Sequence, residues 1–248
     1  NGRSRMFGAL VIQSLVSHKR FNRIVFRQPQ FVIRRRRLRI ARLSTLPELT
    51  VVIRTGEQRL VLLGLVLEDA EDLVRETIYP LWDIGLDVGY ATRSIKQCVN
   101  LALEDVEVLT SLLDARFICG MSPLYSALME KLGQRITSRR SNKIITALIE
   151  NNRQRHRYFG DSAYLLEPNL KEGQGGLRDY HTMLWISQIE FNIKQPRDLE
   201  YLGLLSHEEY QSLRRCLNFI WDARNRIHHL CGRKCDQLNF ENQLKLAD

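Results

Sequence analysis

The alternation of apolar and polar residues predicts a chain that is mainly helical from Leu60 onward. Helical spacing of apolar residues favours helices over 94–103, 106–113, 123–132 and 141–158. The clearest helix follows Ser206, because Ser206 and Glu209 have the spacing of a capping box. Apolar residues then recur along one face, at Tyr210, Leu213, Leu217, Ile220, Trp221 and Ile227. A further helix is expected to begin with Asp179 as its N-cap and to run to about Ile193.

The segment before these helices predicts extended structure. The apolar run 60–67 has the length of a strand or of a buried helical turn, and a helix over 68–79 is expected to end at Pro80. Residues 81–90 are rich in Ile, Leu and Val and alternate as in a strand. A period of two places Asp83 and Asp87 on the same face of that strand. A solvated strand face and a functional site are both compatible with this pattern.

Composition sets the class of protein. A chain of 248 residues that is 44% hydrophobic and 26% charged is expected to fold around a packed core, with Trp82, Trp185 and Trp221 inside it. No apolar run approaches the roughly 20 residues that a membrane span requires. The five cysteines show no regular disulfide framework, so we expect a cytoplasmic protein without a membrane partner.

The net charge of +9 is concentrated at one end of the chain. Residues 1–50 hold twelve Lys or Arg and one acid, Glu48, whereas the other 198 residues hold 25 bases and 27 acids. A basic arm that contacts nucleic acid or an anionic lipid is one interpretation, since Phe7, Phe21, Phe26 and Phe31 are interleaved with the bases. A segment translated in the wrong frame is the interpretation that we prefer, so we do not expect a nucleic-acid partner.

The densest chemical signal lies in residues 164–179, which read YLLEPNLKEGQGGLRD. Glycines let the backbone approach a ligand closely, and the N-terminus of a following helix offers N–H groups to an anion. Lys171 and Arg178 could neutralise phosphate charge there. The spacing fits neither a Walker loop nor a dinucleotide fingerprint, and composition by itself favours a structural turn.

This segment resembles the E-P-N-x-K-E-G-x-G-G-L-R-D signature of the bacterial PII-protein uridylyltransferases, which are bifunctional uridylyltransferase/uridylyl-removing enzymes. Four other stretches are similar to the same family, at residues 81–89, 110–116, 181–185 and 224–234. The resemblance covers roughly residues 65 to 246. The glutamine-synthetase adenylyltransferases share a related K-x-G-x-G-G-I-R element, so a relative of those enzymes stays an alternative.

The resemblance implies an α+β fold that is mainly α. Its parts would be a basic segment unlike the family (1–59), a partial nucleotidyltransferase domain of the DNA-polymerase-β type (60–120) and a helical domain (121–248). The implied reaction transfers UMP from UTP to a tyrosine of the PII signalling protein, with Mg²⁺ held by carboxylates. Asp87 would be the catalytic metal ligand and Asp83 a weaker candidate. The residues around the nucleotide, or shaping an interdomain loop, would be Glu167, Asn169, Lys171, Arg178 and Asp179.

The chain also departs from the family pattern. Two of the family's metal carboxylates lie in a G-G-Y-G-R…S-D-x-D stretch, and this sequence contains no Asp-x-Asp. Tyr90, Met121 and Arg226 stand where His, Asp and an acid are usual. One carboxylate cannot hold two Mg²⁺, so we expect the chain as given to be inactive. A noncatalytic binding module for protein or nucleic acid is the third alternative.

A smaller group of possible metal ligands lies at residues 228–235. It consists of His228, His229, Cys231 and Cys235, which are close enough in sequence to suggest zinc. Adjacent histidines point to different sides, and the C-x-x-C spacing of ordinary zinc sites is absent. A helix end without a metal is the interpretation we favour.

Overall fold

The computed structural model describes residues 49–54, 59–64, 78–83, 89–120, 122–136, 138–162 and 164–247. The basic segment up to residue 48 and the candidate metal ligand Asp87 lie outside these residues. The described residues form two compact units, which divide between Ile144 and Ile145. None of the helices in the described ranges is long and apolar enough to cross a membrane.

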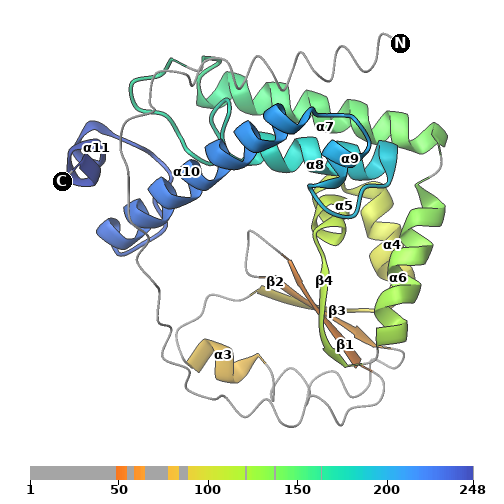
Figure 1. Cartoon of the computed structure of the whole chain (residues 1–248). Helices are drawn as coiled ribbons and strands as arrows, with labels where there is room; N and C mark the ends of the chain where they lie inside the picture. The colour runs from red at the N-terminus through yellow and green to blue at the C-terminus, as the bar shows by residue number, and fades with distance from the viewer. Residues whose placement is uncertain are drawn as a thin grey trace. The chain divides into compact units, whose positions relative to one another are not determined.

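The first unit contains a four-stranded mixed sheet and short helices (Figure 1). Its elements are β1 (Leu49–Arg54), β2 (Arg59–Gly64), α3 (Tyr79–Asp83), β3 (Gly89–Arg93), α4 (Ile95–Glu104), α5 (Val106–Leu113), β4 (Arg116–Gly120) and α6 (Ser122–Arg135). The strand order is β3-β2-β1-β4, in which β1 is antiparallel to both of its neighbours and β2 is parallel to β3. The apolar run that began at Leu60 is therefore a strand as far as Gly64.

Helices α4, α5 and α6 supply the core of this unit. Its buried residues are Cys98, Val99, Ala102, Leu109, Leu112, Leu128 and Leu132, and Ile144 at the start of α7 (Ser138–Phe159) packs against them. Ser94 and Gln97 form a reciprocal capping box that begins α4, and Asp105 caps α5 by accepting from the backbone N–H groups of Glu107 and Val108. Local capping thus sets the two helix starts that the sequence predicted.

The strand predicted for residues 81–90 is wrong in its first part, because Tyr79–Asp83 form helix α3. Most of the helix expected over 68–79 lies outside the described residues. Pro80 itself lies in the first turn of α3, where no backbone N–H is required. Tyr79 and Trp82 stack with ring centroids 5.5 Å apart, which favours the helical spacing of three. Asp83 is thus an exposed residue at the end of α3, and Gly89–Arg93 form strand β3.

The second unit consists of packed helices and the loops that join them. It comprises most of α7 together with α8 (Leu177–Phe191), α9 (Asp198–Tyr201), α10 (His207–Cys231) and α11 (Phe240–Ala247). Leu170 and Leu177 pack against Ile220 and Ile227 of α10 in one apolar cluster. A second cluster joins Ile193, Leu199, Leu205 and Tyr210. Figure 1 shows α8 and α10 side by side, in agreement with these contacts.

The predicted helices are found, with two corrections in this unit. The capping box of Ser206 and Glu209 begins α10, as expected. Helix α8, however, begins at Leu177 with Gly176 as its N-cap, because the carboxylate of Asp179 is engaged by other groups. It ends at Phe191.

The tryptophans are also only partly as predicted. Trp185 is buried, whereas Trp82 is 43% and Trp221 37% exposed. Trp221 directly follows the buried Ile220 and is turned by about 100° from it around α10, where Arg224 covers its ring.

Candidate functional site

The glycine-rich segment folds as a series of tight turns that lead into α8. The Asn169 side-chain oxygen accepts from the backbone N–H groups of Lys171 and Glu172, at 3.1 and 2.8 Å, and so closes the first turn. Gly173 then donates to the Asn169 carbonyl oxygen at 2.9 Å. A Cβ on Gly176 would lie 2.8–2.9 Å from three backbone carbonyl oxygens, so the close packing requires glycine there. The loop is therefore shaped by its own backbone.

The segment before α11 holds the loop from one side. Leu170 N donates to the Asp236 carbonyl oxygen at 2.8 Å, and Asn169 forms an antiparallel bridge with Gln237. The carboxylate of Glu167 accepts from the backbone N–H of Phe240 at 2.7 Å. Glu167 and Asn169, both predicted near the nucleotide, thus bond to backbone groups that fix the loop.

Helix α7 holds the loop through a buried charge network. Arg155 contacts the Asp179 carboxylate and donates to the Glu172 carbonyl oxygen, and His156 Nε2 lies 2.8 Å from Asp179 Oδ1. Gly175 N donates to the other Asp179 oxygen at 2.7 Å. Burial alone would raise the pKa of Asp179, but the His156 hydrogen bond and the Arg155 charge outweigh it and lower that pKa. Asp179 therefore stays ionised at neutral pH and joins α7, the loop and α8.

Two basic side chains share the remaining acid of the loop. Lys171 Nζ lies 3.1 Å from Glu172 Oε1, and Arg178 Nη2 lies 3.4 Å from the same oxygen. The side chains of Lys171 and Arg178 are 25% and 28% exposed, so both keep contact with solvent. Burial opposes ionisation of Glu172, yet Arg178 and Lys171 keep its pKa below the usual range. The two cations have donors left for an anion, since Lys and Arg carry three and five N–H groups.

His181 lies one helical turn after Arg178 in a basic environment. Burial, followed by the charges of Arg178, Lys171 and Arg224, together lower its pKa to about 4, against a smaller opposing effect of the Glu172 charge. Its ring stacks on Trp185 with centroids 5.9 Å apart. The indole N–H of Trp185 is buried, and no hydrogen-bond partner for it lies among the residues that the structure describes. His181 is therefore neutral at pH 7, chiefly because it is buried, with three nearby cations acting in the same direction.

Arg224 extends this basic group from α10. Its Nε donates to Asp236 Oδ1 at 2.6 Å, and its guanidinium lies 5.6 Å from the centroid of the Trp221 ring. His228 Nε2 lies 3.1 Å from the same Asp236 oxygen. Arg224, His228 and Asp236 thus fix the segment that bonds to Leu170 of the loop. In the described residues His228 has Asp236 as its partner, rather than a group of metal ligands.

The structure brings together the five predicted residues of the loop and assigns them two kinds of contact. Glu167, Asn169 and Asp179 hold the fold of the loop, whereas Lys171 and Arg178 flank Glu172 with partly exposed cations.

Sequence reasoning missed the partners that come from elsewhere, namely Arg155, His156, Glu172, His181, Arg224 and Asp236. Glu172 and His181 lay within quoted motifs, and Arg224 within residues 224–234, so the motifs themselves carried a signal for them. Nothing local marked Arg155, which is one basic residue among several on α7.

The sequence of the chain matches one known family of proteins. The sequence model of the GlnD PII-uridylyltransferase family matches residues 143–248. The bifunctional uridylyltransferase/uridylyl-removing enzymes of Bradyrhizobium diazoefficiens and Rhodopseudomonas palustris are each 36% identical over 177 residues, which is 71% of this chain. The enzyme of the same name from Cereibacter sphaeroides is 38% identical over 178 residues.

The matched stretch spans 19% of the length of these relatives. No solved structure matches the chain. The agreement between the family model, the relatives and the loop motif places the chain, through residues 143–248, in the PII-uridylyltransferase family.

Proposed function

We propose that residues 145–247 form the part of a cytoplasmic PII-type uridylyltransferase that binds the phosphates of UTP. The observation that carries this proposal is that Lys171 and Arg178 lie 3.1 and 3.4 Å from the same Glu172 oxygen, with side chains that are 25% and 28% exposed. A nucleoside triphosphate carries several negative charges, and cations on an ordered loop bind such an anion without first having to be ordered. The family description names PII, the relatives' names give a uridylyl group as the group transferred, and UTP is the nucleotide that would donate it.

The charges around the loop support an anionic ligand. Asp179 is occupied by Arg155 and His156, and Asp236 by Arg224 and His228. Glu172 is left to balance Lys171 and Arg178, and it also lies 3.9 Å from Arg155 Nε. Positive charge therefore exceeds negative charge where the two partly exposed cations lie. A phosphate group would supply the missing negative charge.

We also propose an origin for the sheet of the first unit and ligands for Mg²⁺. We propose that its sheet is a remnant of a nucleotidyltransferase domain of the DNA-polymerase-β type, with Mg²⁺ bound by Asp87 and, less favourably placed, Asp83. Among the described residues no three side chains suited to a metal come together, and Asp83 ends a short helix. The described residues do not fit the two-metal site, so we assign no catalytic step to Mg²⁺ in this chain. We propose that the chain as given binds nucleotide but does not transfer UMP.

Nucleotide binding can be tested on the whole chain by titration calorimetry with UTP. The change is Lys171→Ala combined with Arg178→Ala, and Lys194→Ala, an exposed lysine of the same unit, is the control. Charge-assisted hydrogen bonds are worth roughly 1.5–3 kcal/mol each, so the double variant should bind UTP at least about tenfold more weakly. Equal affinity of the double variant and the control would contradict the proposal.

Labelling experiments distinguish UMP transfer to PII from AMP transfer to glutamine synthetase and from binding without transfer. The chain is incubated with Mg²⁺ and labelled UTP or ATP, together with PII or glutamine synthetase. We expect no transfer to either protein from this chain, and transfer from UTP to PII by a full-length relative. Transfer from ATP to glutamine synthetase would instead assign an adenylyltransferase relative. PII binding without nucleotide binding would assign a noncatalytic module.

A further inference from the structure

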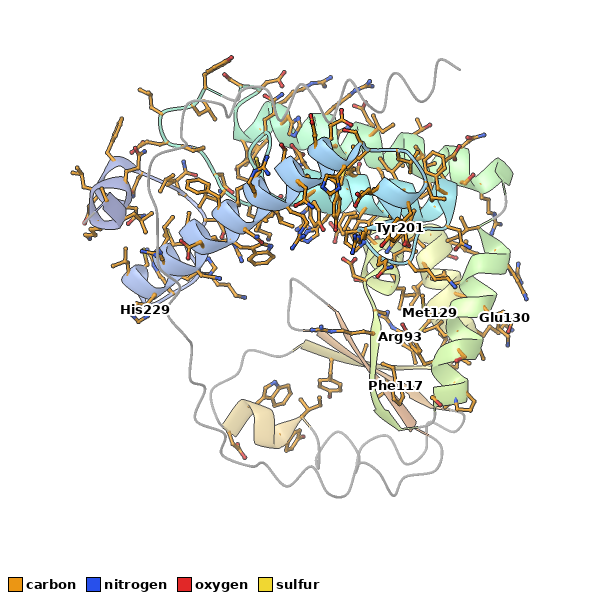
Figure 2. The ribbon with its side chains drawn as sticks, in the orientation of Figure 1. Arg93, Phe117, Met129, Glu130, Tyr201 and His229 are labelled. Atoms are coloured by element: carbon orange, nitrogen blue, oxygen red, sulfur yellow. The ribbon has the colours of Figure 1, made fainter. Side chains whose placement is uncertain are left out.

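Two thiols lie together where α10 ends. Cys231 is the last residue of α10, and Gly232 follows in the left-handed conformation with φ of 62°, which turns the chain back. Cys235 comes three residues later. Figure 2 labels His229 near this end of the helix, two residues before Cys231. The turn brings two cysteines that are four apart in the sequence to the same place.

One buried amide contacts both sulfur atoms. Asn242 of α11 is 5% exposed, and its Oδ1 accepts from Cys231 Sγ at 3.8 Å, while its Nδ2 donates to Cys235 Sγ at 3.7 Å. The Cys235 thiol donates to the Gln237 carbonyl oxygen at 3.8 Å. Both cysteines pack against the cluster of Leu170, Leu177, Ile220 and Ile227, so their positions are fixed by the core of this unit.

We propose that Cys231 and Cys235 are a redox modification site. They form an intramolecular disulfide with each other when they react with a low-molecular-weight disulfide such as oxidised glutathione. One thiolate attacks glutathione disulfide and releases one glutathione, which leaves a mixed disulfide on the protein. The second thiol attacks this mixed disulfide and releases the second glutathione. The protein loses two electrons and two protons, and both are recovered in two glutathione molecules.

The geometry favours this bond over a bond to another cysteine. A disulfide needs sulfur atoms that can approach to about 2.05 Å from side chains directed at one another. Cys231 and Cys235 are four residues apart, and their sulfur atoms contact the two ends of the same Asn242 amide. Cys98 belongs to the core of the other unit. Partial burial and the Cys235 thiol raise the pKa of Cys231 above its usual value, and the charges of Arg233 and Lys245 offset only part of this rise.

The disulfide would act on the segment that holds the glycine-rich loop. Asp236 follows Cys235, and it binds Arg224, His228 and the backbone N–H of Leu170. Asn242 Oδ1 would lose its thiol donor when the bond forms, while Nδ2 keeps the Gln237 carbonyl oxygen at 3.2 Å. Oxidation therefore changes the contacts of α11 next to the loop. This inference does not depend on the proposed nucleotide function.

The test is peptide mapping of the whole chain after equilibration with oxidised glutathione. The sample is quenched in acid, alkylated and digested, and Cys216→Ser is the matched control because Cys216 is also partly exposed. We expect the wild type and the control each to lose the same two alkylatable thiols, in peptides linked through Cys231 and Cys235. Cys231→Ser should carry glutathione on Cys235 and no internal disulfide.

Two results would overturn the proposal. One is alkylation of both Cys231 and Cys235 in wild-type protein under conditions that place glutathione on Cys216. The other is a stable disulfide that links either residue to a different cysteine. Both are read from the unaltered chain, so neither depends on whether a variant folds.

Discussion

The carboxylate of Asp179 provides the sharpest test of how the loop is held. Asp179→Ala removes the anion that contacts Arg155, His156 and the backbone N–H of Gly175. Removing one partner of a buried ion pair destabilises a protein by about 3–5 kcal/mol. Arg155 keeps the Asn152 side chain and the Glu172 carbonyl oxygen as acceptors, so we expect the lower end, about 3 kcal/mol.

The assay is urea unfolding of the whole chain, followed by tryptophan fluorescence in a Trp82→Phe background. The remaining tryptophans, Trp185 and Trp221, both lie in the unit that contains Asp179. With an m-value of roughly 1.5 kcal/mol/M, the midpoint should fall by about 2 M. Asp179→Asn keeps the shape of the side chain and one acceptor oxygen, so its urea midpoint should fall by roughly half as much as that of Asp179→Ala. Glu241→Gln, which breaks an exposed pair with Lys245, is the control and should leave the midpoint unchanged.

The effect also has a defined pH dependence. The folded pKa of Asp179 is below its usual value of 3.8, so its stabilisation is complete above that pH and is lost as the pH falls through the lower folded value. The difference between wild type and Asp179→Ala should therefore shrink below pH 3.8. A loss of less than about 1 kcal/mol at pH 7, or a difference that is unchanged in acid, would refute the buried-carboxylate argument.

Three further changes test the packing, the buried imidazole and a helix cap. Gly176→Ala should destabilise the fold by about 2–3 kcal/mol, because the new Cβ meets three carbonyl oxygens. Gly133→Ala in α6 is the control, since its Cβ meets nothing within 4 Å, and it should stabilise the fold by about 1 kcal/mol. Urea midpoints that move in the same direction for both variants would contradict this reasoning. Between pH 6.5 and about 4, the unfolded His181 takes up a proton that the folded one does not. The free energy of unfolding should therefore decrease as the pH is lowered through this range, by up to roughly 1.4 kcal/mol per pH unit. His181→Gln should flatten that slope in urea titrations at different pH values, and an unchanged slope would exclude His181 as its source. Ser206→Ala removes the cap of α10 and should cost about 1 kcal/mol in thermal unfolding followed by circular dichroism, with no loss expected if the cap is not formed in solution.

Features that depend on neighbours in sequence were predicted well. Ser206 and Glu209 cap α10 because the interaction spans three residues and needs no other element. The same holds for Ser94, which begins α4. By contrast, Asp179 had the right type and place for a helix cap, but its carboxylate bonds to Arg155, which lies 24 residues earlier. No local pattern reveals that competition, so the predicted N-cap was wrong by three residues.

The site was predictable in its membership and much less so in its roles. A motif identifies residues that occur together, and all five predicted loop residues do lie together. It does not distinguish Asn169, whose amide oxygen closes a turn, from Lys171, whose ammonium group is partly exposed. Trp221 shows the same limit, because helical spacing placed it on the apolar face beside Ile220, while the cation of Arg224 covers its ring at the surface.

Local charge can differ from net charge in the nearly neutral part of this chain. Outside residues 1–50 the chain holds 25 bases and 27 acids, so net charge alone gives no reason to expect an anion site. The structure sorts these charges by burial. Asp179 is paired with Arg155, which is 12% exposed, whereas Lys171 and Arg178, which are 25% and 28% exposed, share the single carboxylate of Glu172. Because solvent screens charges less in partly buried positions, such local sorting produces a positive potential that the total charge hides.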